Sequence, residues 1–299
     1  MRELLITGAV RFDDEQFNMI KELGYNITFV QDERIKLDIP VHHFDTVICN
    51  SLFLNNPVSD FEKLERIQLT SAGYDRVPMD YITEKGIEIF NAGGVYSVPM
   101  AEFALCGVLA LYKNTRFFDK NKSDKKWEKN RNIKELYGKT VCILGAGNIG
   151  TEVAKRFKAF GTEVIGVDIS KKENACFSKV VALDELDSVL HIADIVILTL
   201  PLTEKTNAFF DKSRLDAMKN DAVLVNISRG RIVKETDLID SLNSGQLFGA
   251  VLDVFEEEPL DENSPLWNFD NVVLTPHNSF VGENNQKRLF DLILNNLRY

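Results

Sequence analysis

The 299-residue sequence has few cysteines and few histidines, four of each. No two cysteines form a C-x-x-C pair, and Cys49, Cys106 and Cys142 lie in apolar runs typical of small buried side chains. No two histidines have the spacing of a helical metal-binding pair. We therefore expect no metal site, no disulfides, and a reducing, cytoplasmic location.

The sequence also lacks long apolar runs and an excess of positive charge. No run reaches the roughly 18 apolar residues that mark a membrane helix, and the first residues turn polar too soon for a secretory signal. Acidic residues outnumber basic ones by 45 to 35, which gives a net charge of −10. That charge disfavours nucleic acid and anionic membrane surfaces as partners. A globular protein of this length is expected to form two domains.

One β-α-β unit is clear in the middle of the chain. A short apolar strand at 141–144 leads into Gly-Ala-Gly-Asn-Ile-Gly at 145–150, and an apolar-periodic helix continues to Phe160. A second strand at 164–168 ends in Asp168. The G-x-G-x-x-G spacing inside such a unit predicts a Rossmann dinucleotide-binding turn rather than a structural glycine turn.

Each conspicuous residue of this unit has a physical task. Gly145 allows the tight turn, Gly147 lets backbone amides approach a pyrophosphate, and Gly150 lets the helix pack close to the strand. The helix N-terminus, at Asn148 and Ile149, presents its amides to the phosphates. Asp168 is placed to accept hydrogen bonds from the adenosine ribose and would repel a 2′-phosphate, so the sequence predicts NAD rather than NADP as the cofactor.

Strands alternate with helices on both sides of this unit, which predicts two doubly wound parallel sheets. We expect a first domain at 1–94 plus 281–299 and an NAD-binding domain at 95–280. A long apolar helix at 98–118 is expected to cross between the domains, and the polar stretch 119–134 to be solvated, with Trp127 as its anchor. A last helix at 284–297 is expected to return to the first domain. The other expected strands are at 4–7, 27–30, 46–49, 66–69, 87–90, 180–181, 194–200, 222–226, 249–252 and 271–274. The other expected helices are near 17–23, near 57–64, from about Pro78 onwards, and over Leu183, Leu186 and Leu190.

Polar or special residues follow several of the later strands. They are Pro201, the segment 226–229, Asp253 and His277. Open α/β sheets bind ligands just outside the carboxyl ends of their strands. This arrangement predicts a site at that edge of the second sheet.

Three of these later residues can carry hydride-transfer chemistry. A histidine such as His277 suits proton transfer because its ordinary pKa is near ~6.5. A carboxylate such as Glu258 orients the ring through its far nitrogen, and Arg229 can clamp a substrate carboxylate bidentately. Taken singly, each has a structural alternative: a histidine beside a proline, an acid in a solvated acidic run, and a surface cation.

Short motifs recur in order along nearly the whole chain. They stand at 71–75, 101–104, 135–140 leading into 145–150, 200–203 with Thr206, 225–230, 252–255 with 258–260, and 275–277. With these motifs the sequence resembles the D-isomer-specific 2-hydroxyacid dehydrogenase family. The resemblance implies a flavodoxin-like substrate domain beside the Rossmann NAD-binding domain, an active site in the cleft between them, and a homodimer built largely through the NAD-binding domain.

The resemblance also implies roles for individual residues. His277 would be the acid/base with Glu258 as its partner, and Arg229 would bind the substrate's carboxylate and carbonyl oxygen. The backbone amides of Ala72 and Gly73 would hold the carboxylate from the other side. NAD would contact a set of residues that comprises Gly145, Gly147, Asn148, Ile149, Gly150, Asp168, Pro201, Thr206, Ile227, Ser228 and Asp253.

The leading hypothesis is therefore an NAD-dependent D-2-hydroxyacid dehydrogenase or 2-keto acid reductase. One alternative is an NAD(H)-sensing scaffold of the corepressor kind with little or no turnover, because a fold does not decide function. Another is a short-form phosphoglycerate dehydrogenase, since the chain ends soon after its last helix. The segment 278–281 departs from the small residues and glycine that many members carry after the histidine. The sequence leaves the particular 2-hydroxy acid open.

Overall fold

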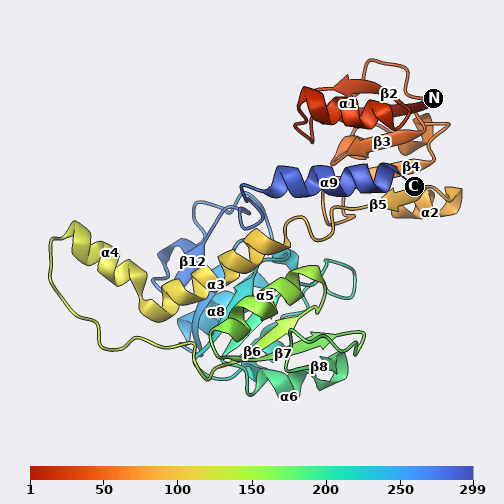
Figure 1. Cartoon of the computed structure of the whole chain (residues 1–299). Coiled ribbons are helices and arrows are strands. Elements are labelled where there is room, and N and C mark those ends of the chain that lie inside the picture. The colour runs from red at the N-terminus through yellow and green to blue at the C-terminus, as the bar shows by residue number, and fades with distance from the viewer. Residues whose placement is uncertain (299) are drawn as a thin grey trace. The chain divides into compact units, whose positions relative to one another are not determined.

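The structure is a computed structural model that describes residues 1–298. It divides into two compact units (Figure 1): unit 1 comprises Met1–Tyr96 and Gly282–Tyr299, and unit 2 comprises Ser97–Val281. The sequence predicted boundaries at 94/95 and 280/281. Tyr299, the last residue of the predicted substrate domain, lies outside the described residues.

Unit 1 is built on a parallel sheet that has five strands in the described residues, in the order β2-β1-β3-β4-β5. The pairing is regular, as when Leu4 of β1 faces Ile27 of β2. The edge strands are therefore β2 and β5. The strands are β1 (Arg2–Thr7), β2 (Tyr25–Val30), β3 (Thr46–Cys49), β4 (Arg66–Leu69) and β5 (Glu88–Phe90).

Helices cover both faces of this sheet. One face packs against α1 (Asp14–Glu22) and α9 (Asn285–Leu297), where Ile20 and Ile293 are fully buried. The other face packs against α2 (Met79–Lys85) through Ile82. The last helix, expected at 284–297, packs as the sequence predicted.

One predicted helix of unit 1 is wrong. The segment 57–64 forms only the 3₁₀ turn η2 (Val58–Asp60), after another short turn, η1 (Leu52–Leu54). Phe61 follows η2 with φ −91° and ψ +72°, which is not helical. Its side chain is buried in the same core as that of Leu64. The backbone is therefore extended here, which buries both side chains, and does not continue as a helix.

Unit 2 is built on a second parallel sheet, with seven strands in the part of the chain that the structure describes, in the order β12-β11-β10-β9-β6-β7-β8. The order reverses between β6 and β9, the point at which doubly wound sheets bind ligands. Its strands are β6 (Thr140–Leu144), β7 (Glu163–Asp168), β8 (Lys179–Ala182), β9 (Ile195–Leu198), β10 (Ala222–Asn226), β11 (Leu247–Leu252) and β12 (Val272–Leu274).

The helices at 186–190, 212–217 and 235–243 enclose a large apolar core between themselves and the sheet. The helix that follows the glycine turn, α5 (Asn148–Ala159), packs extensively against α3 (Ser97–Lys113). The helices are α3 (Ser97–Lys113), α4 (Thr115–Ser123), α5 (Asn148–Ala159), α6 (Leu186–Leu190), α7 (Lys212–Ala217) and α8 (Glu235–Asn243), with 3₁₀ turns η3 (Leu183–Glu185), η4 (Gly230–Ile232) and η5 (Pro265–Asn268).

The expected helix at 98–118 is corrected in two respects. It ends at Lys113, because Asn114 takes a left-handed conformation with φ +50°, and α4 then runs in a new direction (Figure 1). Furthermore, α3 belongs wholly to unit 2 instead of crossing between units. Asparagine tolerates this backbone region better than most residues, but the apolar pattern before it does not indicate that the helix ends there.

The expected anchoring role of Trp127 is wrong. Its side chain is 99% exposed, on the irregular segment that follows α4. We call residues 115–134, that is α4 and this segment, the arm. Figure 1 shows the arm extending away from the sheet of unit 2.

Candidate active site

The glycine turn after β6 has the geometry that its spacing predicts. Gly145 has φ +98°, and a Cβ at Gly150 would lie 1.9 Å from the carbonyl oxygen of Gly145. A Cβ at Gly147 would meet no atom within 4 Å. Gly145 and Gly150 are thus required by the fold itself, whereas the space beside Gly147 is open to a ligand.

The N-terminus of α5 and the end of β7 meet at this turn. The first helical amide to find a backbone acceptor is that of Thr151, which donates to Gly147, so the preceding amides of Asn148, Ile149 and Gly150 are available. Asp168 accepts hydrogen bonds from the Ala146 amide at 2.8 Å and the Ser170 amide at 3.1 Å. Open space, free amides and a nearby carboxylate fit the pyrophosphate and ribose of a dinucleotide.

His277 and Glu258 form a close pair beyond the ends of β12 and β11. The His277 Nδ1 lies 2.8 Å from the Glu258 Oε2, and the side chains are 39% and 36% exposed. The other carboxylate oxygen, Oε1, accepts the Phe255 amide at 3.2 Å. With Nδ1 held by the carboxylate, the ring presents Nε2 for chemistry.

Asp253 determines the shape of the loop that carries His277. Its carboxylate is fully buried and accepts hydrogen bonds from the Thr275 hydroxyl at 2.6 Å, the Asn278 amide at 2.7 Å and the Ser279 amide at 3.0 Å. Its carbonyl oxygen accepts the His277 amide at 2.7 Å. His277 itself has φ +49°, so this network holds the histidine in a backbone conformation that L-residues rarely adopt.

Sequence reasoning assigned Asp253 to the cofactor and missed this internal role. An acid directly after the apolar strand β11 was the available signal, because a carboxylate so placed must find several donors if it is buried. The hydrogen-bond donors themselves, at 275–279, are not identifiable from sequence spacing.

Arg229 stands at the end of β10 in a turn that is internally bonded. The Asn226 side chain donates to the carbonyl of Arg229 at 3.0 Å and accepts from the hydroxyl of Ser228 at 2.8 Å. Arg229 is half-buried, and its Nη1 donates to the Ser228 carbonyl at 2.8 Å.

The next residue, Gly230, joins this turn to the loop of Glu258. A Cβ at Gly230 would lie 1.8 Å from the backbone of Phe255. The turn of Arg229 and the loop that begins at Phe255 are thus in backbone contact, which a larger residue would prevent. The structure therefore brings Arg229, Glu258 and His277 to neighbouring loops of unit 2.

The remaining predicted contacts are distributed more widely. The Thr206 hydroxyl donates to the Pro201 carbonyl at 2.7 Å and accepts the Thr203 amide at 2.7 Å, which closes the loop after β9. Ile227 and Ser228 are buried.

Ala72 and Gly73 lie in unit 1, on the loop after β4. The carbonyl of Ala72 accepts from Asn91 at 2.7 Å and the carbonyl of Gly73 from Ser71 at 2.9 Å. These bonds fix the loop while using carbonyls and not the two amides.

An apolar pocket of about 510 Å³ adjoins the histidine–glutamate pair within unit 2. Besides His277 and Glu258, its lining includes Leu260, Trp267 and Leu274. No pattern in the sequence indicates this pocket, because its walls come from separate loops.

The described residues contain no group of three or more His, Cys, Asp or Glu side chains arranged to hold a metal ion. Among residues 1–298, no helix is both long enough and apolar enough to span a bilayer.

Comparison with known proteins identifies the family. Residues 105–279 match the model described as D-isomer specific 2-hydroxyacid dehydrogenase, NAD binding domain. Among curated proteins, the chain is 38% identical over 229 residues to D-3-phosphoglycerate dehydrogenase of Methanocaldococcus jannaschii, a match that covers 76% of this chain and 43% of that enzyme. It is 33% identical over 242 residues to glyoxylate reductase of Korarchaeum cryptofilum, with coverages of 79% and 72%.

Solved structures agree with these matches. A glyoxylate reductase from Paecilomyes thermophila superposes with a TM-score of 0.87 at 25% identity, covering 99% of this chain and 94% of that one. A D-isomer specific 2-hydroxyacid dehydrogenase family protein from Aeromonas salmonicida gives 0.80 at 28% identity, with coverages of 99% and 94%. The chain therefore belongs to the D-isomer specific 2-hydroxyacid dehydrogenases, and its cofactor is NAD.

Proposed function

We propose that this chain catalyses the reversible reduction of a small 2-keto acid to the D-2-hydroxy acid, with His277 as the acid/base. The observation that carries the proposal is the 2.8 Å contact between His277 Nδ1 and Glu258 Oε2 beside the turn of Arg229. Bound NADH supplies the hydride, and the protein must supply the proton that the carbonyl oxygen takes up.

His277 donates that proton from Nε2 in the direction of reduction and takes it back in oxidation. Glu258 holds the ring in one orientation, since its carboxylate accepts the Nδ1 proton throughout. The buried Asp253 supports the step indirectly by holding the His277 loop.

Arg229 binds the substrate's carboxylate and polarises its carbonyl oxygen. A guanidinium suits this task because its planar N–H groups match a carboxylate bidentately and its charge persists at any working pH. We assign the amides of Ala72 and Gly73 to the same carboxylate. Their carbonyls are already hydrogen-bonded, so the peptide planes of this loop are held in place.

For the cofactor, we assign the pyrophosphate to the amides of Asn148 and Ile149 and the ribose to Asp168. Asp168 favours NAD over NADP because its carboxylate would repel a 2′-phosphate. Lys171 and Lys172 are the cations close to it in sequence, and Lys171 is paired with Glu185 at 2.6 Å. Pro201, Thr206, Ile227 and Ser228 complete the proposed cofactor contacts. Asp253, which is fully buried, is instead assigned to holding the His277 loop.

NADH consumption against a panel of 2-keto acids tests the proposal. Glyoxylate, hydroxypyruvate and 3-phosphohydroxypyruvate belong to the panel because relatives are named for glyoxylate reduction, hydroxypyruvate reduction and D-3-phosphoglycerate dehydrogenation. Pyruvate and larger branched or aromatic keto acids extend it, since the pocket beside His277 is apolar. We expect turnover with at least one member and a preference for NADH over NADPH. Protein that binds NADH but turns over none of them would contradict the proposal.

We also propose that the chain forms a homodimer through the arm and resides in the cytoplasm. Trp127 is 99% exposed on the arm, and Phe118 and Ile133 are 42% and 44% exposed. Apolar side chains gathered on one projecting segment are typical of an interface. The four cysteines are free thiols, in keeping with a reducing compartment.

A further inference from the structure

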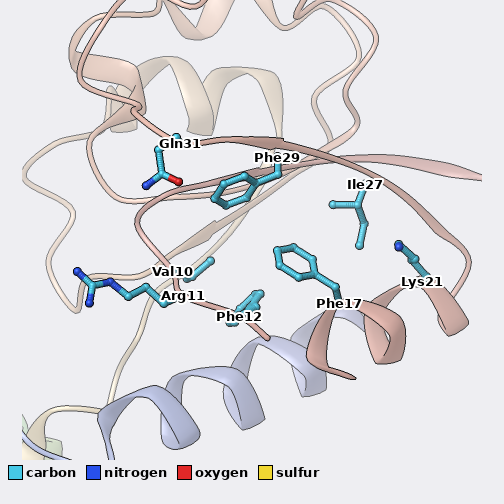
Figure 2. A pocket seen from close by; sticks show the side chains of 8 residues that line it. All are labelled: Val10, Arg11, Phe12, Phe17, Lys21, Ile27, Phe29 and Gln31. Carbon is cyan, nitrogen blue, oxygen red and sulfur yellow. The ribbon is translucent and has the colours of Figure 1, made fainter. Parts of the chain in front are cut away.

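Unit 1 contains a second pocket, remote in sequence from the residues assigned to catalysis. It has a volume of about 480 Å³, within the range of small-molecule sites. Its walls come from the loop after β1, from α1 and from β2 (Figure 2). Since β2 is an edge strand, no further strand of the sheet closes this side.

The residue spacing explains why these side chains converge. Phe17 and Lys21 are four residues apart on α1 and so lie on one face of that helix. Ile27, Phe29 and Gln31 alternate along β2 and its continuation and therefore point to one side of the sheet. The two sets face each other across the pocket in Figure 2.

The centre of the pocket is aromatic. Phe17 packs edge-on against Phe12, with ring centroids 5.8 Å apart, and against Phe29, at 6.0 Å. Phe29 is 44% exposed. Rings ordered by edge-to-face contacts beside open volume provide a rigid apolar surface for a flat ligand.

The ends of the pocket are polar and cationic. Figure 2 shows Arg11 and Gln31 at one end and Lys21 at the other. Within residues 1–298, neither Arg11 nor Lys21 makes an ion pair. The acid nearest to Arg11 in sequence, Asp13, is the N-cap of α1 and accepts the Gln16 amide at 2.8 Å. Because the chain has 45 acidic and only 35 basic residues, a guanidinium without an ion pair is unexpected.

We propose that this pocket binds a carboxylate that carries a flat apolar body. The body lies against Phe17 and Phe29, and the carboxylate is bound by the Arg11 guanidinium and the Gln31 amide. Arg11 contributes more than Lys21 because its planar donors match a carboxylate bidentately, whereas an ammonium is a single point charge. The pocket is lined by residues of unit 1 alone, whereas the proposed acid/base pair belongs to unit 2, and the proposal does not depend on the proposed function.

The test uses 3-phenylpropionate, a carboxylate with neither a 2-oxo nor a 2-hydroxy group, titrated into the full-length chain and followed by ligand-observed NMR. We expect saturable binding. Arg11→Gln should weaken it about tenfold or more, and Lys21→Gln by less than about threefold. The neutral isostere 3-phenylpropanamide should bind at least about tenfold more weakly.

Arg229→Gln serves as the control for binding at the proposed active site. We expect this variant to bind 3-phenylpropionate as the wild type does, and Arg11→Gln to keep its NADH-dependent turnover. The proposal is overturned if the wild type does not bind the probe, if Arg11→Gln binds it unchanged, or if the amide binds equally well. Loss of binding in Arg229→Gln would place the probe at the active site and overturn the proposal too.

Discussion

In the turn after β6, one glycine is required by the fold and another leaves space for a ligand. At Gly150 an added methyl group would collide with the Gly145 carbonyl, whereas at Gly147 it would enter open space. The two positions are three residues apart in one turn, so substitution of each by alanine is a matched pair.

We expect Gly150→Ala to lower the free energy of unfolding by about 2 kcal/mol or more, because backbone must move to admit the methyl group. Gly147→Ala should leave the unfolding free energy within about 0.5 kcal/mol and weaken NADH binding about tenfold, because the methyl group occupies the approach of the pyrophosphate. Urea unfolding and NADH fluorescence titration measure the two effects. Equal loss of stability in both variants, or unchanged NADH binding in Gly147→Ala, would contradict these assignments.

At this scale the sequence predicted a good deal of the candidate site. Glycine spacing and the order of strand, turn and helix were sufficient to predict the turn, because steric limits on backbone approach act locally. Neither the hydrogen-bond donors of Asp253 nor the close contact of Gly230 with Phe255 was predictable. Both depend on which segment lies opposite, and that is decided by tertiary packing.

Among the elements, the strands were predicted well and the connections poorly. β3, β4 and β10 have the predicted bounds, because buried parallel strands are nearly continuous apolar runs. The break between α3 and α4 at Asn114 and the non-helical course after Val58 were missed. At Asn114 a single left-handed residue breaks a pattern that hydrophobic spacing alone would continue. From Phe61 to Leu64 no residue is helical, although the same spacing predicts a helix there.

Asp194, just before β9, ties neighbouring strands of unit 2 together. Its carboxylate is 14% exposed, accepts the Thr140 amide at 3.0 Å and pairs with Lys219 at 2.7 Å. Burial alone would raise its pKa, but the Lys219 and Thr140 hydrogen bonds and the charge of Lys139 lower the pKa overall from 3.8. A lowered pKa in the folded state means that the charged carboxylate stabilises the fold.

We expect Asp194→Asn to lower the free energy of unfolding by about 1–2 kcal/mol at pH 7. This contribution is fully present above the unfolded-state pKa of about 3.9 and is lost as the pH falls through the lower folded-state pKa. The difference from wild type should therefore shrink below about pH 4. Denaturant unfolding at pH 7 and in this acid range measures it, and a difference that stays constant or grows would contradict the account. Asp216→Asn, which removes an exposed pair with Lys212, is the control and should cost less than about 0.5 kcal/mol.

At the scale of the whole molecule, the division into two units followed from the alternation of strands and helices and from the return of the last helix. The course of the arm did not, since a solvated charged segment carries no periodic signal. Its exposed tryptophan is explained if a second copy of the chain covers it.

We therefore expect the wild type to have the mass of a dimer in light scattering at micromolar concentration, and Trp127→Ser to shift it towards the monomer. Because the Trp127 side chain is 99% exposed, Trp127→Ser should alter the far-ultraviolet circular dichroism little. Trp267→Ser, at the other tryptophan, which is 51% exposed and lines the pocket beside His277, is the matched control and should leave the mass unchanged. A monomeric wild type, or a Trp127→Ser variant that remains dimeric, would contradict the proposed interface.

The central claim is that His277, held by Glu258, transfers the proton that accompanies hydride transfer. The most direct measurement compares single-turnover oxidation of bound NADH in the wild type and in His277→Ala, with the best 2-keto acid of the panel. We predict a loss of about 100-fold or more in the rate with an NADH dissociation constant within about threefold of wild type, since the ring is assigned to the proton and not to cofactor affinity. A His277→Ala protein that oxidises NADH at the wild-type rate would contradict the account.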